Sequence, residues 1–253
     1  MASTSKGILW VGTSNNVVPG DKLSFPMAYR DKSRLHYYAS FFNSLEVNRS
    51  FYQVPQRKTF ERWAMDVPED FQFTVKLWRG ITHAKGLAYD AKDIDTFLSA
   101  ANGLQAKKGC LLIQFPASIR IEQFAAIRKL LTEIRDACTG DPWRMAIELR
   151  HSSLYVDSVF EMLDEMNASL VMHDMPASAP SAINSAANFL LLRFHGIKGD
   201  YRGGYTKTFL QKKAKEIKTW LAKGMDVYVY FNNTIGDAFE NAKTLQQLVN
   251  GNL

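Results

Sequence analysis

Charged and amide side chains recur where short apolar segments of the chain end. Glu148 and Arg150 end one such segment, and Arg193 and His195 end another. Carboxylates and imidazoles exchange protons with substrates, and guanidinium groups bind carboxylate or phosphate through paired hydrogen bonds. The segment-ending polar residues are Glu46, Asn48, Lys76, Gln114, Glu148, Arg150, Asp174, Arg193, His195, Asn232 and Asn233. This combination favours acid–base chemistry on a small anionic molecule.

Four of these residues form the predicted catalytic group. Glu46 or Glu148 would be the general base, and His195 would be its acid partner. Lys76 could form a Schiff base if burial and a neighbouring arginine lowered its pKa. Lys76 and the two arginines would also hold the anion, and the other segment-ending residues are predicted to bind the ligand.

The apolar segments themselves read as strands buried on both faces, the signature of a parallel sheet. They are Ile8–Ser14, Ser44–Ser50, Phe71–Trp78, Cys110–Phe115, Arg144–Arg150, Ser169–Asp174, Phe189–His195 and Asp226–Asn232. Helix-like stretches lie between most of them: Leu35–Phe42, Thr59–Met65, Ala91–Leu104, Ile121–Ala137, Val156–Met166, Thr206–Ala222 and, after the last, Ala238–Val249. Eight such units predict an α/β fold, the (β/α)₈ TIM barrel. Only Met175–Asn188, with two prolines, separates strands six and seven, so its helix should be degenerate or missing.

Alternation along the strands predicts which side chains face the barrel interior. Glu148 and Arg150 share one face of their strand, as do Arg193 and His195. These groups can therefore converge at the carboxyl ends of the strands, where barrel enzymes place their active sites. For strands six and eight the parity stays open between His173 and Asp174, and between Asn232 and Asn233. A purely structural network of neutralising charges is the competing interpretation.

A glycine-rich stretch after strand seven is a second candidate site. Gly196, Gly199, Gly203 and Gly204 are interleaved with Tyr201 and Tyr205, which we predict to contact ligand. Barrels often bind phosphate with the loops after strands seven and eight. Asp237, near the start of the last helix, opposes an anion there.

Metal binding is a further possibility at the same strand ends. His83, His173, Asp174, His195 and the two glutamates could form a mixed nitrogen and oxygen site. The charges of Lys76, Arg150 and Arg193 would repel a dication, so we predict no metal and no cofactor.

Composition narrows the class of protein. The 253 residues are 46% hydrophobic with a net charge of +6, and 12 Lys and Arg against 7 Asp and Glu lie in residues 1–85. A mild basic surplus suits an anionic ligand and is weaker than a dedicated nucleic-acid binder requires, so nucleic acid is a possible but not favoured partner. No signal segment, membrane span or C-x-x-C pair is present, which predicts a cytoplasmic protein with reduced cysteines. We expect a single domain over 1–253; the oligomeric state stays open.

The motifs at the strand ends resemble one known family. They are Phe42-x-x-x-Glu46-x-Asn48-x-x-Phe51-Tyr52-x-x-Pro55, Phe71-x-Phe73-x-Val75-Lys76, Ile81-Thr82-His83, Leu112-x-Gln114-Phe115-Pro116, Glu148-x-Arg150-His151, Arg193-Phe194-His195-Gly196 and Phe231-Asn232-Asn233. With these motifs the chain resembles the YecE-like family of domain-of-unknown-function proteins over most of its length. The resemblance implies a TIM-barrel fold and no assigned reaction.

Three functions are compatible with these residues. The favoured one is binding or transformation of a small anionic, phosphorylated or sugar-like compound, with the enzyme class open between hydrolase, lyase and isomerase. The second is a metal-dependent phosphodiesterase similar to endonuclease IV, acting on nucleic acid. The third is a non-catalytic barrel that binds a ligand or nucleic acid.

Overall fold

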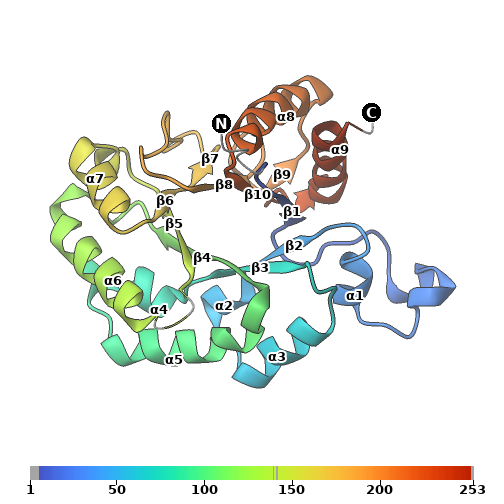
Figure 1. Ribbon diagram of the computed structural model, residues 1–253, viewed down its shortest axis with the longest axis horizontal. Coiled ribbons are helices and arrows are strands. Elements are labelled where there is room, and N and C mark those ends of the chain that lie inside the picture. The colour runs from blue at the N-terminus through green and yellow to red at the C-terminus, as the bar shows by residue number, and fades with distance from the viewer. Residues whose placement is uncertain (1–5, 139, 141, 252–253) are drawn as a thin grey trace.

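The computed structural model describes residues 6–138, 140 and 142–251, and Figure 1 shows its elements. The strands are β1 Leu9–Thr13, β2 Ser44–Val47, β3 Gln72–Lys76, β4 Lys108–Phe115, β5 Arg144–Leu149, β6 Ser169–Leu170, β7 Met172–His173, β8 Phe189–Phe194, β9 Arg202–Gly203, β10 Asp226–Phe231 and β11 Ile235–Gly236. The α-helices are α1 Arg34–Tyr38, α2 Arg49–Tyr52, α3 Arg57–Met65, α4 Arg79–Thr82, α5 Ala91–Ala101, α6 Phe124–Ala137, α7 Asp157–Glu165, α8 Lys207–Ala222 and α9 Ala238–Asn250. Short 3-10 turns cover Lys22–Ser24, Met27–Tyr29, Lys85–Leu87, Asn102–Lys107, Ile121–Gln123 and Ser152–Leu154.

The larger strands close into a parallel barrel. β2, β3, β4, β5 and β6 pair in chain order, and β7, β8, β10 and β1 pair as a second run. The runs join where Ser14 bridges Glu46 and where Val171 alone separates β6 from β7. β6 and β7 are therefore two halves of one strand, and eight strands enclose the barrel interior in the described part of the chain. The (β/α)₈ fold predicted from the sequence is confirmed.

One glycine permits the closure between β1 and β2. A Cβ at Gly12 would lie 2.0 Å from the carbonyl oxygen of Ser44 and 2.6 Å from the hydroxyl of Tyr38. Both atoms are fixed by their own strand and helix. A larger residue would therefore push β1 away from β2 and open the barrel at the join.

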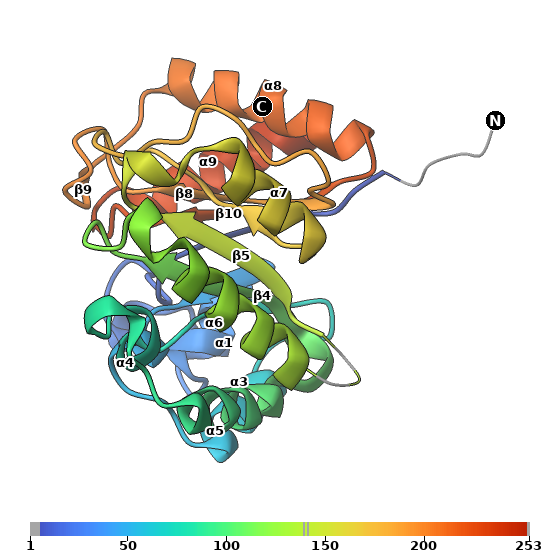
Figure 2. The ribbon, with the colours of Figure 1, turned by 90° about the vertical axis from the view of Figure 1, so that its left-hand side faces the viewer.

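Helices cover the outside of the barrel, and some of them begin at a capping side chain. In Figure 2, α8 and α9 lie on one side of β8 and β10, and α3 and α5 lie on the far side, beyond β4. Asp90 accepts a hydrogen bond from the backbone of Lys92 to start α5, and Thr206 accepts one from Phe209 to start α8. Each cap satisfies an amide that the first turn leaves without a partner.

The segment between the sixth and seventh barrel strands connects β7 to β8. It contains no helix, as its two prolines predicted. The buried side chain of Asn184 binds the adjoining backbone instead. Its Oδ1 accepts from the Leu170 amide at 2.9 Å, and its Nδ2 donates to the Ala168 carbonyl at 2.9 Å. A side-chain amide here provides hydrogen bonds to the start of β6, next to the place where a crossover helix would otherwise pack.

The buried residues form two layers. The outer one packs the helices against the barrel, and the inner one fills the barrel with Trp10, Cys110, Leu112, Ala146, Val171, Phe189, Leu191, Tyr228 and Tyr230. Inner-layer residues share the parity of Glu148 and Arg193 on their strands, which confirms the predicted alternation. The charged ends therefore lie above a sealed apolar interior, where an unpaired charge is costly.

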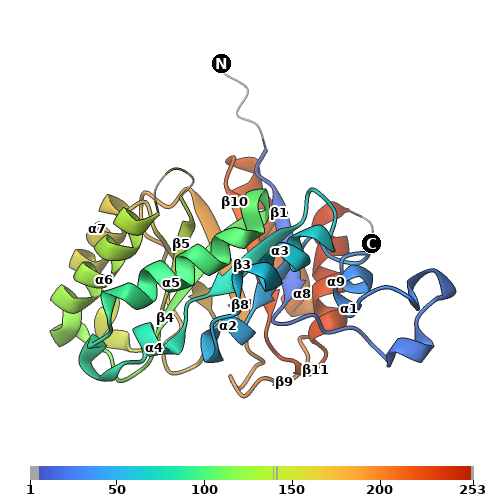
Figure 3. The same ribbon diagram turned by 90° about the horizontal axis from the view of Figure 1, so that it is seen from below.

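The carboxyl ends of the strands carry several small elements that the sequence did not predict. α2 and α4 follow β2 and β3 directly, and β9 pairs with β11 in a two-residue parallel ladder. Figure 3 shows all four on the same side of the barrel, opposite the N-terminus. In the described residues no helix is long and apolar enough to cross a membrane.

Candidate functional site

A chain of hydrogen bonds links the strand ends around the barrel mouth. It runs in order through Ser14, Glu46, Arg193, Glu148, Arg150, His195, Asp174 and Tyr205. These residues come from five strands and the loops that follow them. The structure thus brings together most of the residues that the sequence placed at strand ends.

Arg193 is the centre of this network and is only 1% exposed. Its Nε and Nη2 each donate to a carboxylate oxygen of Glu46 at 2.7 Å, and its Nη1 donates to Glu148 at 2.6 Å. Burial alone would raise the pKa of Glu46, but the Arg193 guanidinium outweighs burial and lowers it. For Glu148 burial is likewise outweighed, by Arg150 and Arg193, and its pKa falls well below the usual value. Both glutamates are therefore ionised at neutral pH.

This geometry corrects two of the roles expected from sequence. A general base needs an accessible carboxylate with a pKa close to the working pH, and Glu46 and Glu148 are buried, paired and shifted the other way. Arg193 is occupied by both of them and is sealed from solvent, so it balances charge instead of clamping an anion. The three residues form a buried ionic triad across three strands.

Lys76 differs from its charged neighbours because it has no ion-pair partner among the described residues. Its side chain is 9% exposed, and its Nζ makes no hydrogen bond or ion pair with the residues that the structure describes. The ammonium lies 3.9 Å from the ring centroid of Phe51. Burial and the nearby Arg193 lower the pKa of Lys76 to about 8. Four charged groups act on Lys76, two arginines and two glutamates, and their formal charges cancel, so together they leave the Lys76 charge uncompensated.

Arg150 presents the second available cation. Its Nε donates to Glu148, and its Nη2 donates to His195 Nε2 at 3.1 Å. Its Nη1 makes no hydrogen bond within the described ranges, and the side chain is 12% exposed. Both N–H groups of Nη1 therefore remain for a ligand.

His195 is held in one tautomer by its neighbours. Arginine only donates hydrogen bonds, so Nε2 accepts from Arg150, and Nδ1 carries the proton that points to Asp174 Oδ1 at 3.2 Å. The backbone amide of His195 donates to the same oxygen at 2.7 Å. Burial is the main cause that lowers the pKa of His195. A neutral ring whose Nε2 is already occupied is a poor general acid, so the predicted acid role is not supported by this arrangement.

Nitrogen NMR of the histidine side chains tests this state. We expect the His195 ring to be neutral at pH 7 with the proton on Nδ1, because an arginine donor faces Nε2. The resonances are assigned from their loss in His195→Gln. In Arg150→Gln the tautomer preference should weaken. A doubly protonated ring at pH 7 in the wild type would contradict the hydrogen-bond pattern.

The other histidines at the mouth also bind protein groups. His173 Nε2 donates to the Leu149 carbonyl at 3.0 Å. His173 lies in β7 in register with the inward-facing Arg193, so His173 and not Asp174 faces the barrel interior. His83 Nε2 lies 3.4 Å from the amide nitrogen of Gln114. Burial lowers the pKa of both histidines to about 4. Asp174 follows the strand and turns back to His195.

The asparagines separate into two groups. Asn232 keeps the interior parity of Tyr230, whereas Asn233 is buried away from the mouth and donates to the Gly203 carbonyl at 2.7 Å and to Asn241 at 3.1 Å. Asn233 therefore anchors the β9 segment to α9 and is removed from the ligand-binding set. Asn48 has a buried Oδ1 that accepts no hydrogen bond from the described residues, so an acceptor is left at the mouth.

The whole chain was compared with known proteins. A sequence model of the family described as protein of unknown function DUF72 matches residues 10–253. The chain belongs to the DUF72 family. It is 29% identical over 258 residues to the UPF0759 protein YunF of Bacillus subtilis, covering 89% of each chain. It is 26% identical over 121 residues to the UPF0759 protein YecE of Escherichia coli, covering 48% of this chain and 43% of YecE. The YecE-like resemblance is thus confirmed.

Solved DUF72 structures share the fold of this chain. A family protein from Enterococcus faecalis matches with a TM-score of 0.77 and 23% identity, covering 96% of both chains. One from Thermotoga maritima matches with a TM-score of 0.72 and 22% identity, covering 96% of this chain and 99% of its own. At this identity the likeness concerns the fold alone.

The metal-dependent alternative lacks a ligand set in the DUF72 site. Among the residues that the structure describes, no group of three or more histidine, cysteine, aspartate or glutamate side chains is arranged to hold a metal ion. The candidate ligands bind protein instead, as His173 does with Leu149 and Asp174 with Tyr205. The glutamates at the barrel mouth neutralise arginine side chains.

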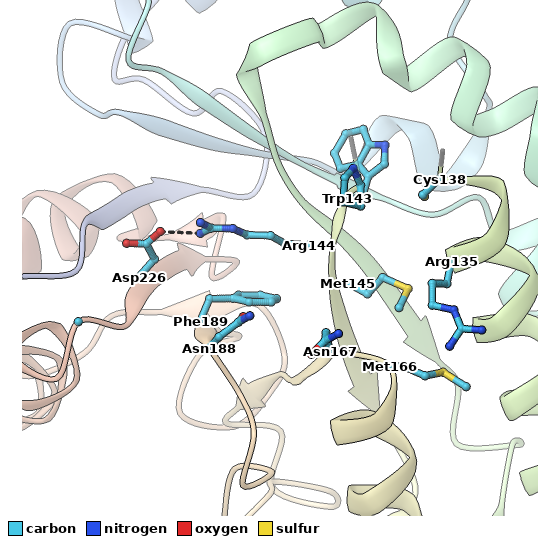
Figure 4. A pocket seen from close by; sticks show the side chains of 12 residues that line it. Arg135, Cys138, Trp143, Arg144, Met145, Met166, Asn167, Asn188, Phe189 and Asp226 are labelled. Atoms are coloured by element: carbon cyan, nitrogen blue, oxygen red, sulfur yellow. Dashed lines mark hydrogen bonds and ion pairs between the residues drawn. The ribbon is translucent and has the colours of Figure 1, made fainter. Parts of the chain in front are cut away.

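A cavity of about 550 Å³ lies at the opposite end of the barrel (Figure 4). It is lined by residues from the starts of the strands, including Arg144, Phe189 and Asp226. Arg144 and Asp226 form an ion pair of 2.7 Å across it. Because these two charges neutralise each other, this cavity is a weaker candidate for binding an anion than the mouth around Lys76.

Two residues of the DUF72 site were missed as site residues in the sequence. Phe51 packs against Lys76, and Tyr155 donates to the Leu149 carbonyl at 2.7 Å beside His173. Phe51 stands five residues after Glu46, within the motif that carried the family resemblance. Its position on a helix at the mouth could have been found only by expecting α2 immediately after β2.

Proposed function

We propose that the strand-end site of this DUF72 protein binds a small anionic molecule between Lys76 and Arg150. The observation that carries the proposal is the buried Lys76 ammonium without an ion-pair partner in the described chain. A buried cation is unfavourable unless something compensates it. A phosphate or carboxylate would do so, and Arg150 Nη1 would add charge-assisted hydrogen bonds.

Neutral polar groups around these cations fit a hydroxylated ligand. Asn48 Oδ1 accepts from no donor that the structure describes, and Gln114 is held at the mouth by a long contact to His83. A hydroxyl group donating to Asn48 would satisfy the buried acceptor. The proposed ligand is therefore a phosphorylated or carboxylated compound with hydroxyl groups, such as a sugar acid or sugar phosphate.

Lys76 is also the acid–base group of the proposed chemistry. With a pKa of about 8, Lys76 is mostly protonated at pH 7 and can lose its proton at a pH only slightly above neutral. The glutamates and His195 are held in single states by their partners. We therefore assign proton transfer to Lys76, in place of the glutamate base predicted from sequence, for a lyase, isomerase or hydrolase reaction.

Titration calorimetry with inorganic phosphate tests the binding. We expect Lys76→Met and Arg150→Met each to weaken phosphate binding by about tenfold or more, because each removes a direct charge-assisted contact. Lys223→Met, a matched loss of one exposed lysine, should leave the Kd unchanged. Calorimetry is preferred because anions such as sulfate also raise melting temperatures by exclusion from the surface. Equal phosphate affinities in all four proteins would overturn the proposal.

A further inference from the structure

The segment 196–203 at the barrel mouth contains an unusual residue choice. Four of its residues have left-handed backbone: Gly196, Gly199, Tyr201 and Gly203, with φ of 91°, 69°, 65° and 68°. Three are glycines, which adopt this conformation without a steric penalty. The fourth is a tyrosine, whose Cβ is strained there. The backbone alone would favour glycine or asparagine at position 201.

The conformation of Tyr201 is imposed from both sides. Its amide donates to the carbonyl of His195 at 2.7 Å, at the end of β8. Its carbonyl accepts from the amide of Ile235 at 3.0 Å, at the start of β11. The backbone at Tyr201 is thereby held in place next to the small β9–β11 ladder seen in Figure 3.

Neither burial nor hydrogen bonding explains why an aromatic ring stands at this position. Tyr201 is 39% exposed, and its hydroxyl makes no hydrogen bond with the described residues. Its ring contacts the His195 ring edge-on, with centroids 5.8 Å apart. His195 in turn accepts from Arg150, so the ring lies one residue away from a cation of the proposed site. Two exposed apolar residues lie on the same elements: Ile197, 66% exposed, in the segment 196–203, and Ile235, 60% exposed, in the strand paired with β9.

We infer that Tyr201 is the specificity residue of the site and stacks on a flat, apolar face of the ligand. The inference rests on the proposed function and narrows the ligand class. The ligand would carry its anionic group toward Lys76 and Arg150 and a planar face, a sugar ring or an aromatic ring, toward Tyr201. Aromatic side chains commonly supply this kind of apolar contact in small-molecule sites.

Two phosphate esters that differ only in the planar group test the inference. Titration calorimetry would compare phenyl phosphate with methyl phosphate on the full chain. We expect the wild type to bind phenyl phosphate about tenfold more tightly, and Tyr201→Asn to bind both equally, since asparagine tolerates the left-handed backbone and removes the ring. Tyr201→Phe should keep the preference. Met65→Asn, which removes an exposed apolar side chain at the end of α3, should also keep it.

The outcomes separate the two proposals. If neither ester binds the wild type, the proposed function fails and this inference fails with it. If both bind and Tyr201→Asn keeps the preference for phenyl phosphate, this inference alone is wrong. A merely structural ring would instead lower the melting temperature of unliganded Tyr201→Asn while leaving the ratio of the two affinities unchanged.

Discussion

Replacing Arg193 with methionine should lower the free energy of unfolding by about 3 to 5 kcal/mol. Arg193 is fully buried and is the hydrogen-bonding partner of both Glu46 and Glu148. Its removal leaves two carboxylates in the interior, one of them without any cationic hydrogen-bond partner. Urea unfolding at pH 7, followed by circular dichroism, would measure the change.

Two controls make this result specific to the triad. Arg128→Met breaks an exposed ion pair with Glu165 and should cost less than about 1 kcal/mol. Adding Glu46→Gln and Glu148→Gln to Arg193→Met should restore much of the lost stability, because neutral side chains need no buried counter-ion. A loss below about 1 kcal/mol in Arg193→Met would mean that the triad is not buried as described.

Replacing Lys76 with methionine should have the opposite effect and stabilise the unliganded protein by about 3 kcal/mol at pH 7. The pKa of Lys76 falls from 10.5 to about 8 on folding, chiefly because burial disfavours the charge. Below pH 8 the folded and unfolded chains both carry this proton, and the folded state bears the full cost. Methionine fills a similar volume without a charge.

The pH dependence of this difference follows from the same pKa values. Between about pH 8 and 10.5 the unfolded chain binds the Lys76 proton while the folded chain releases it, so wild-type stability rises with pH relative to Lys76→Met. The advantage of the variant should therefore shrink as the pH is raised from 8 toward 10. Denaturant unfolding at pH 7 and pH 10 in phosphate-free buffer would show it, with Lys223→Met as the reference. A Lys76→Met protein less stable than the wild type at pH 7 would indicate that Lys76 has a stabilising partner.

These opposite signs separate the two kinds of charge at the barrel mouth. We expect Arg193 to stabilise the folded state and Lys76 to reduce its stability. A residue that costs stability and has a shifted pKa at a strand end is typical of a functional site. The structural-network interpretation therefore fits the triad, and the ligand-binding interpretation fits Lys76 and Arg150.

Local pattern was enough to predict the barrel and the inward face of most strands. The strands around Glu148 and Arg193 alternate along a few consecutive residues, so the sequence itself shows which side chains point inward. Alternation did not decide which of two adjacent side chains faces the barrel interior where a strand is broken, as at Val171, or where it ends at two polar residues, as at Asn232 and Asn233. His173 proved to face inward because β7 pairs with β8 in register with Arg193.

By itself the sequence determined the (β/α)₈ fold, the missing helix between strands six and seven, and the gathering of polar groups at one rim. The strand alternation and the proline-containing connection are local patterns, so a short stretch of sequence is enough to recognise them. The polar groups gather at one rim because the carboxyl ends of parallel strands lie at the same end of a barrel. Only the tertiary structure decided the partners within that rim. Arg193 meets Glu46 across 147 positions and Glu148 across 45, through barrel closure and register that no local pattern encodes. Once both carboxylates are bound to arginines, Lys76 is left without an ion-pair partner in the described part of the chain.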